Sequence, residues 1–356
     1  MHVIAGLLEA ALEAQIGSAA AVSIGDAGVE REWLVTGWTR RIPTRGPAID
    51  ARVPFDLASL TKPMATAALA MVLVGDGELD LAAPIRRWFP EAAASATVHQ
   101  LLGHAGGVAA HVEFFRTLRA LPDSADPYTQ LVAQAARHPA GAPGHATLYS
   151  DLGYILLGAI LERVVGLPLD LAVRARVTEP LGLAATSYPG AAALPRAVAT
   201  ELDDRGLVSG LVHDENAYFG GGVCGHAGLF APIGDVAAFA AAIVETWSGR
   251  PRGRLRSEVV RRFLGESAAP STTWRLGWDT PAPGTGMSHA GDRWPRTGAV
   301  GHTGFTGTSL WLDLPRGRWV ALLTNRVHPT RHGTADAIKA LRRSVGDAAW
   351  ALFDPS

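Results

Sequence analysis

Phe55-Asp56-Leu57-Ala58-Ser59-Leu60-Thr61-Lys62-Pro63-Met64 is the stretch that decides the fold of this chain. Lysine occurs only at positions 62 and 339, among 32 lysines and arginines in 356 residues. Arginine is effectively always protonated, whereas a buried lysine can lose its proton and act as a base. Residues three positions apart share one face of a helix, so Lys62 can reach Ser59. A serine beside an unprotonated lysine is an activated nucleophile, although a surface lysine that follows a serine by chance has the same spacing.

The residues that follow Ser59 predict a buried helix. They are rich in alanine and end at Gly75-Asp76-Gly77. Pro63 is tolerated only near the start of a helix, so the helix should begin at about Ser59. The helix dipole would then favour negative charge that develops on the serine oxygen.

The composition indicates one folded domain over residues 1–356, because 48% of the residues are hydrophobic and 18% are charged. A net charge of −1 argues against a nucleic-acid or membrane-surface partner. No lysine or arginine precedes Arg31, which argues against a secretory signal, and the apolar run 64–74 is too short to span a membrane. The single cysteine, Cys224, fits a reducing compartment. We therefore expect a soluble, cytoplasmic protein, and the sequence does not indicate its oligomeric state.

Strands are predicted near both ends of the chain, and helices between them. The opening segments are a helix at 3–16 and strands at 19–24 and 32–38. The closing segments are strands at 299–302, 308–314 and 319–325, followed by a helix at 334–353. Between them, Thr97 is a predicted N-cap for Val98–Leu102, and Asp151–Val165 is strongly helical. This order predicts an α+β fold with a sheet subdomain at about 1–58 and 291–356 and a helical insertion at about 59–290.

Two further motifs stand where strands or loops end. Tyr149-Ser150-Asp151 follows a loop rich in proline and glycine and precedes the 151–165 helix. His302-Thr303-Gly304 stands at the end of the first closing strand. Taken singly, the tyrosine could be a packing aromatic and the histidine an ordinary strand residue.

Taken together, the order Ser-x-x-Lys, Tyr-Ser-Asp, His-Thr-Gly resembles the serine β-lactamase and penicillin-binding-protein superfamily. The resemblance is closest to the class C branch and its esterase and peptidase relatives. It extends over nearly the whole chain, including the segments 79–91, 97–108, 143–183, 212–217, 225–230 and 301–325. It implies a β-lactamase/transpeptidase-like fold with an antiparallel sheet built from both termini. It also implies a serine acyl-hydrolase that forms a covalent acyl-enzyme, without a cofactor, on a small-molecule or short-peptide ester or amide, including D-amino-acid compounds.

The resemblance also assigns roles to residues. Ser59 would be the acylated nucleophile, Lys62 would remove or relay its proton, and Tyr149 would protonate the leaving group. The backbone N–H groups of Ser59 and Phe305 would form the oxyanion hole. Substrate binding would involve Asp151, His302, Thr303 and Gly304.

Two residues depart from the common family pattern. Asp151 stands where asparagine is frequent, and its charge should favour the protonated form of Lys62. His302 stands where lysine is frequent, and a neutral histidine is a weaker partner for a substrate carboxylate. Both departures weigh against efficient β-lactamase activity. A β-lactamase or a D-alanyl-D-alanine carboxypeptidase remains an alternative enzyme, and a penicillin-recognising sensor is the alternative without catalysis.

Other conspicuous residues give weaker signals. The twelve histidines show no metal-ligand spacing on one element, so we expect no metal site. His213 and Asp214 are interpreted as loop residues that brace the rim of the cleft, and Cys224 as a small buried thiol. Three tryptophans could line an acyl pocket or simply pack: Trp274, Trp278 and Trp294.

Overall fold

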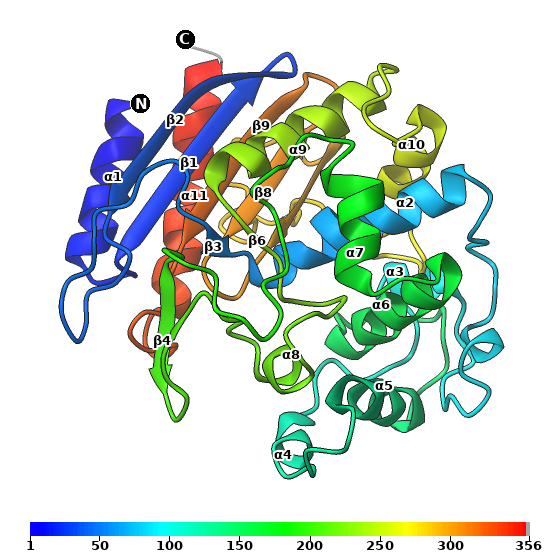
Figure 1. The fold of residues 1–356 in the computed structure, drawn as a ribbon. Coiled ribbons are helices and arrows are strands. Elements are labelled where there is room, and N and C mark those ends of the chain that lie inside the picture. The colour runs from blue at the N-terminus through cyan, green and yellow to red at the C-terminus, as the bar shows by residue number, and fades with distance from the viewer. Residues whose placement is uncertain (354–356) are drawn as a thin grey trace.

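The computed structural model describes residues 1–353 and builds its main sheet from both ends of the chain (Figure 1). The strands, all antiparallel to their neighbours, are in the order β2-β1-β9-β8-β7. Their bounds are β1 (Ala19–Asp26), β2 (Val29–Gly37), β7 (Ala299–Thr303), β8 (Ser309–Asp313) and β9 (Arg318–Thr324). Strands β1 and β9 lie side by side, with Val22 opposite Leu322. The predicted sheet of both termini and the α+β fold class are confirmed.

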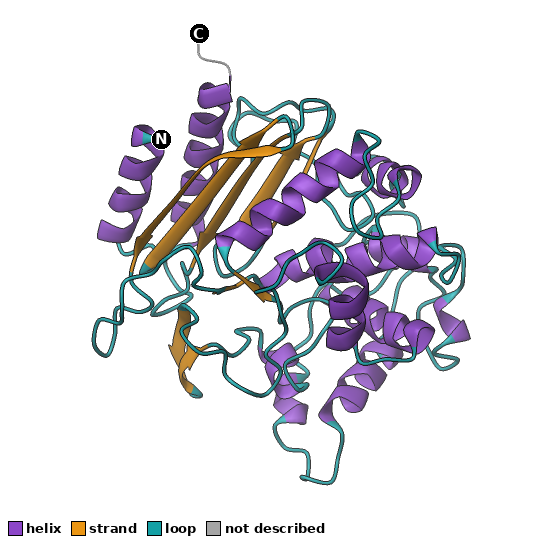
Figure 2. Ribbon diagram, turned by 45° about the horizontal axis from the view of Figure 1, so that its top comes forward, coloured by secondary structure: helices purple, strands orange, loops and turns teal. Residues whose placement is uncertain are grey.

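Helices cover both faces of this sheet (Figures 1 and 2). On one face lie α1 (His2–Glu13) and α11 (Ala335–Phe353), and on the other lies α9 (Ile233–Trp247). Side chains alternate along β1, so that Val22 packs toward α1 and α11 whereas Ala21 joins the larger core on the opposite side. Because both faces of β1 are covered, Ala19–Gly25 is buried throughout.

The segment between β2 and β7 is mainly helical. Its helices besides α9 are α2 (Ala68–Gly75), α3 (Val98–Leu102), α4 (Phe115–Leu118), α5 (Pro127–Arg137), α6 (Asp151–Val165), α7 (Leu169–Val173), α8 (Glu215–Phe219) and α10 (Ser257–Gly265), with a π-helical turn η4 (Arg174–Thr178) and a 3₁₀ turn η3 (Ile85–Arg87). Two small sheets pair β3 (Phe55–Asp56) with β6 (Phe230–Ala231) and β4 (Ala199–Asp203) with β5 (Gly206–Ser209). The division into a sheet subdomain and a helical insertion at about 59–290 remains a prediction. Helix α9 lies within that insertion in sequence, yet it packs on the main sheet.

Capping explains why two of these helices begin where the sequence predicted. Thr97 and Gln100 form a reciprocal capping box at the start of α3. The Ser150 hydroxyl accepts the Gly153 N–H at the start of α6, and Gly166 ends that helix in the left-handed conformation. The bounds predicted for both helices are confirmed.

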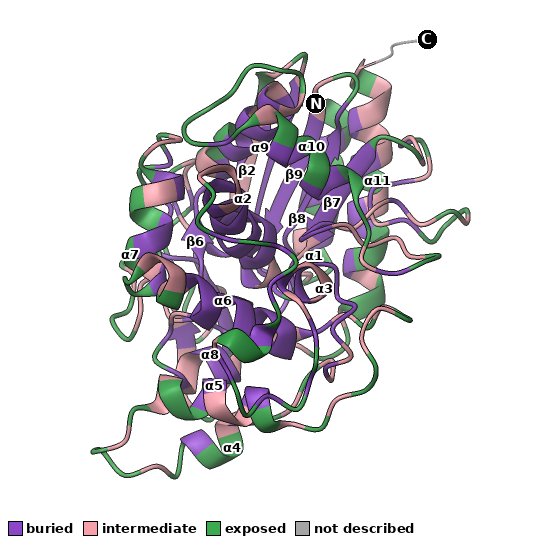
Figure 3. Ribbon diagram, turned by 90° about the vertical axis from the view of Figure 1, so that its right-hand side faces the viewer, coloured by how far each residue is buried: buried purple, intermediate pink, exposed green. Residues whose placement is uncertain are grey.

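The helix that carries the Ser-x-x-Lys motif is irregular. It begins as a 3₁₀ turn, η1 (Ala58–Leu60), continues as a π-helical turn, η2 (Lys62–Ala67), and becomes α-helical only in α2. Pro63 lies at the start of η2, as its lack of an N–H group requires. The stretch Ala58–Gly75 is long and apolar enough to cross a membrane, yet 83% of it is buried within the protein core (Figure 3).

Gly25 offers a test of the contact between β1 and β9. It lies opposite Trp319, and a Cβ atom at this position would be 2.1 Å from the buried indole ring. Replacing Gly25 with alanine should therefore lower the free energy of unfolding by about 1–3 kcal/mol, the usual cost of overpacking a core. Urea denaturation would measure this change. The control is Gly6→Ala, at an exposed position of α1 where no atom lies within 4 Å of the added Cβ. Alanine there should stabilise the helix by up to about 1 kcal/mol. Equal effects of the two changes would contradict the packing argument.

Candidate active site

Ser59 lies in a backbone turn that the end of β7 holds in place. The residue before it, Ala58, has a φ of +47°, a conformation that non-glycine residues rarely adopt. The Thr308 hydroxyl donates to the carbonyl of Leu57 at 2.9 Å. Gly304 is packed so closely that a Cβ atom there would be 2.1 Å from the Thr308 hydroxyl and 2.4 Å from the Leu57 oxygen. The His-Thr-Gly motif therefore ends directly against the turn that carries the serine.

Lys62 is fully buried and fully hydrogen-bonded. Its ammonium donates to the Ser59 hydroxyl at 3.0 Å, to Asp151 Oδ1 at 2.7 Å and to the His226 carbonyl at 3.2 Å. An ammonium group has three N–H donors, so each donor has one acceptor. The predicted neighbours Ser59, Lys62 and Asp151 are thus brought together.

The charge state of Lys62 follows from its neighbours. Burial alone lowers the pKa of Lys62, but the negative charge of Asp151 raises it by more, so the net pKa lies above its ordinary value. Burial alone raises the pKa of Asp151, but the charge of Lys62 lowers it by more. The net pKa of this carboxyl lies well below its usual range, and the group is ionised at neutral pH. The resting site therefore contains an ammonium–carboxylate pair rather than a free amine.

Tyr149 is half-buried beside this pair. The Lys62 ammonium lies 4.8 Å from the centroid of its ring. Burial raises the pKa of Tyr149, and the charge of Lys62 offsets this only in part. The phenol thus stays protonated in the resting site and can donate a proton.

His104 holds the backbone on both sides of Tyr149. Its Nδ1 accepts the N–H of Ser150 at 3.1 Å, its carbonyl accepts the N–H of Leu148 at 2.9 Å, and its ring lies 4.7 Å from the tyrosine ring. Burial lowers the pKa of His104 well below its usual value, so the ring is neutral and Nδ1 is free to accept. The sequence analysis assigned no role to His104. Its position in the 97–108 segment was the available signal.

His302 is buried at the end of β7 and is neutral. Its Nδ1 lies 2.8 Å from the Thr303 carbonyl, and burial together with the charge of Lys62 lowers the pKa of His302 to about 3. This histidine therefore provides no positive charge for a substrate carboxylate. Thr303, Gly304 and Phe305 line a cavity beside Ser59. Phe305 is 51% exposed.

Asp214 does more than the predicted bracing of the rim. It is the N-cap of α8, where it accepts the N–H of Ala217 at 2.8 Å, and it lies 2.9 Å from His226 Nε2. Burial lowers the pKa of His226, but the Asp214 charge outweighs burial and raises it to about 10. The resulting ion pair fixes His226, whose carbonyl accepts a hydrogen bond from Lys62. Sequence reasoning missed this role.

These residues surround one cavity of about 600 Å³. Trp274 lines it, whereas Trp278 and Trp294 are buried in the core, and Cys224 is a buried free thiol as expected. The cavity wall includes Ser59, His111, Tyr149, Asp151, Asp214, His302 and Arg342.

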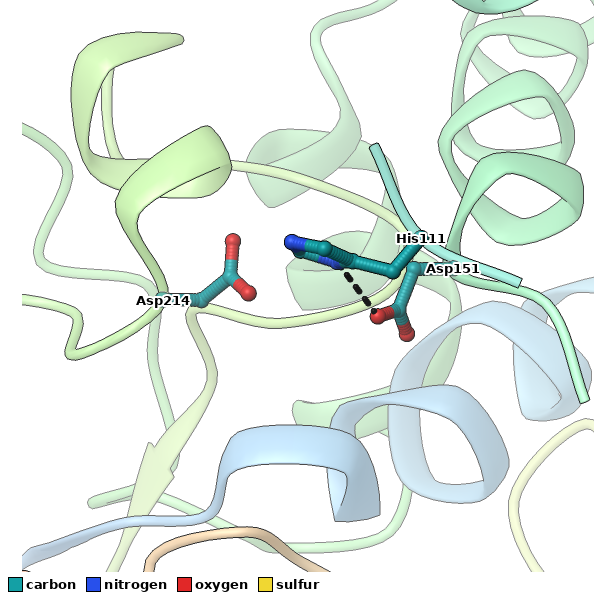
Figure 4. A group of neighbouring side chains, drawn as sticks. All are labelled: His111, Asp151 and Asp214. Atoms are coloured by element: carbon teal, nitrogen blue, oxygen red, sulfur yellow. Dashed lines mark hydrogen bonds and ion pairs between the residues drawn. The ribbon is translucent and has the colours of Figure 1, made fainter. Parts of the chain in front are cut away.

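His111, Asp151 and Asp214 converge on one side of this cavity (Figure 4). Their donor atoms all lie within 4.8 Å of one another. Asp151, however, already faces Lys62, and Asp214 already faces the protonated His226. Because both carboxylates are paired with internal cations, this geometry favours an ion-pair network over a metal centre.

Comparisons with known proteins agree with this geometry. The family model described as Beta-lactamase matches residues 5–343. The chain is 31% identical over 309 residues to the Escherichia coli K12 protein named "Putative D-alanyl-D-alanine carboxypeptidase", an alignment that spans 77% of this chain and 69% of that protein. It is 29% identical over 313 residues to the N-acetylmuramyl-L-alanine amidase of Bacillus subtilis 168, spanning 80% and 70% of the two chains. The solved structure of SurE with D-Leu matches at a TM-score of 0.70 and 25% identity, covering 97% of this chain and 74% of that one.

Replacing Lys62 with arginine tests whether the site needs a cation or a group that can lose its proton. Arginine keeps the charge but cannot act as a base, so reaction of the serine with a fluorophosphonate should slow by about 10²-fold or more. The rate would be measured by intact-protein mass spectrometry, with circular dichroism to check folding. Lys339→Arg is the matched control, because this lysine is exposed, pairs with Asp336 at 3.3 Å and should be replaceable without loss. If the serine of the Lys62→Arg protein reacts at the parental rate, Lys62 is not the base.

Proposed function

Because this chain belongs to the Beta-lactamase family, and is thus a hydrolase of the β-lactamase and peptidase type, we propose that Ser59 is its nucleophile. The reaction is acyl transfer from an amide or ester to the serine oxygen, followed by hydrolysis of the acyl-enzyme. The observation that carries the proposal is the 3.0 Å hydrogen bond between Lys62 and the Ser59 hydroxyl, with the Tyr149 ring 4.8 Å from the same ammonium.

Acylation requires that the Ser59 proton leave as the oxygen attacks. In the proposed step, neutral Lys62 takes the hydroxyl proton while Oγ forms a bond to the substrate carbonyl carbon. The electrons of the C=O bond move onto the carbonyl oxygen. Collapse of this tetrahedral intermediate re-forms C=O and breaks the bond to the leaving nitrogen or oxygen, which receives its proton from the Tyr149 phenol. Lys62 then returns a proton to Tyr149. In deacylation, water takes the place of the leaving group and the same proton transfers run in reverse.

The oxyanion is proposed to lie between the backbone N–H groups of Ser59 and Phe305. Within residues 1–353, the Phe305 N–H donates to no other group of the protein, so it is available to a ligand. The Phe305 carbonyl is held by the Arg326 guanidinium at 2.8 Å, which fixes the orientation of this peptide segment. Preorganised donors of this kind stabilise the charge that develops in the transition state.

We further propose that the substrate carries a carboxylate near the scissile bond. Arg342 is buried at the edge of the cavity, donates to the carbonyls of Gly304 and Thr308, and forms no ion pair with a carboxylate of the described chain. Its Nε has no partner there. Burial lowers the pKa of Arg342 to about 9, which leaves it charged at neutral pH. An unpaired buried cation beside Thr303 is a partner for an anionic group, and it provides the charge that neutral His302 does not.

The names of the relatives fit an amide substrate of this kind. One relative is named for D-alanyl-D-alanine carboxypeptidase and another for an N-acetylmuramyl-L-alanine amidase, and the SurE structure holds D-Leu. Peptides with a D-amino acid, a free carboxylate or an N-acetylmuramyl acyl group are therefore the first substrates to assay, beside p-nitrophenyl esters and penicillin.

Ser59→Ala tests the nucleophile. The change removes only the attacking oxygen, so turnover should be abolished and the melting temperature kept. Intact-protein mass spectrometry after a fluorophosphonate should show one adduct in the parent and none in the variant. Residual turnover within tenfold of the parent would show that another group attacks. Labelling of the parent by penicillin with no turnover of any ester or peptide would instead support a sensor.

Tyr149→Phe tests the proton donor. The phenylalanine ring keeps the packing against His104 and Trp274 but cannot transfer a proton. We expect kcat to fall by about 10²–10⁴-fold, the usual range for a general acid or base. Steady-state kinetics, with an ester and with an amide as substrates, would measure kcat and KM separately. An effect confined to KM would make Tyr149 a substrate-packing residue.

A further inference from the structure

The carboxylate of Asp151 lies between two nitrogen groups rather than one. Its Oδ1 accepts from the Lys62 ammonium at 2.7 Å, and its Oδ2 lies 3.2 Å from Nδ1 of His111. The lysine is fully buried, whereas the histidine side chain is 44% exposed on the wall of the cavity. One carboxylate thus connects the buried ammonium beside Ser59 to an imidazole that is open to solvent. Figure 4 shows the contact between His111 and Asp151.

The backbone holds His111 in this position. The N–H of Asp151 donates to the carbonyl of Ala110 at 2.8 Å, and the Ser150 hydroxyl donates to the carbonyl of Ala109 at 2.6 Å. On the other side, the Asn216 side chain donates to the carbonyl of Val112 at 2.8 Å, which ties the same loop to α8. The contact between His111 and Asp151 is therefore part of the folded frame, and not a chance approach of a free surface side chain.

This contact addresses a problem that the proposed mechanism raises. Lys62 must be a neutral amine to accept the serine proton, yet Asp151 stabilises its ammonium form. A carboxylate that accepts hydrogen bonds from two N–H groups shares its negative charge between them. It therefore stabilises each group less than it would stabilise one group alone. The second partner therefore determines how strongly Asp151 holds the proton on the lysine.

We propose that His111 is a positioning residue for catalysis: its hydrogen bond to the outer oxygen of Asp151 draws negative charge away from Lys62 and lowers the pH at which the lysine becomes a base. This inference rests on the proposed role of Lys62. His111 touches neither the serine nor the reacting atoms and acts only through Asp151.

Other ionisable groups face this chain of contacts from several elements. Facing Lys62, burial keeps His104 and His302 neutral and Tyr149 protonated. Facing His111, Asp214 is ionised and paired with protonated His226. On the outer side, Glu113 pairs with Arg116, and farther along the wall Glu215 pairs with Arg331 and His213 with Glu201. The hydrogen bond to Asp151 raises the pKa of His111 itself, which agrees with a shared carboxylate charge.

The test follows the rate of fluorophosphonate labelling of Ser59 against pH, which requires no knowledge of the natural substrate. In His111→Leu, Asp151 would act on Lys62 alone, so the lysine pKa rises and the acid limb of the rate profile should move to higher pH by about half a unit or more. Because Lys62 titrates above its ordinary pKa, the labelling rate should fall by the same factor, about threefold or more, at each pH on this limb. His111→Asn is the conservative variant, because its amide can donate to the same carboxylate oxygen, and it should restore part of the shift.

The decisive comparison uses Asp151→Asn, which removes the charge that His111 is proposed to share. That variant should move the acid limb to lower pH, and adding His111→Leu to it should cause no further shift. Melting temperatures of all variants would check folding. An unchanged rate in His111→Leu, or a loss of the same size when His111→Leu is added to the Asp151→Asn variant, would overturn the inference. Absence of any labelling in the unaltered protein would refute the proposed nucleophile instead, so the two failures are distinguishable.

Discussion

The buried ammonium of Lys62 is the interaction on which the rest of the site depends. A charged group withdrawn from water is stable only if it is paired and hydrogen-bonded. The three acceptors of Lys62 come from η1, from the start of α6 and from the loop that contains His226, which lies 164 residues from Lys62 in the sequence. These three parts of the chain must therefore pack correctly before the charge is satisfied. The same requirement brings the Ser-x-x-Lys and Tyr-Ser-Asp motifs into one cavity, while the close packing of Gly304 against Leu57 brings in the third motif.

Much of the fold was predictable because local rules decide it. The continuous run of small and apolar residues in β1, the capping box at Thr97 and the serine cap at the start of α6 are all encoded within a few residues. Pro63 located the start of the motif helix for a simple steric reason. The irregular course of that helix, from a 3₁₀ turn to a π-helical turn, could not be read from periodicity. The face shared by Ser59 and Lys62 nevertheless survives, because the spacing of three residues brings them together in the 3₁₀ turn as well.

The parts of the site that sequence reasoning missed depend on contacts between distant segments. His104 reaches the Ser150 N–H across 46 positions, and His111 reaches Asp151 across 40. His226 gains its charge from Asp214, although both stood in segments whose resemblance to the family had been noted. A residue type and its neighbours in sequence do not reveal which partner it meets in the folded chain. Burial of Lys62 by itself favours a free amine, but Asp151 keeps an ammonium in the resting site, as its negative charge led us to expect from the sequence.

Three buried histidines around Lys62 and Tyr149 show that partners, rather than burial, set the charge. All three are almost completely buried: His104, His226 and His302. Only His226 faces a carboxylate, and it alone is protonated at neutral pH, while the other two have pKa values well below their usual range. The two neutral rings pack against Tyr149, so they add no positive charge beside Lys62. Because these rings are neutral and His226 is paired with Asp214, the charged group that contacts the Lys62 ammonium is Asp151. The protonation of Lys62 is therefore set by one carboxylate rather than by the burial that it shares with its neighbours.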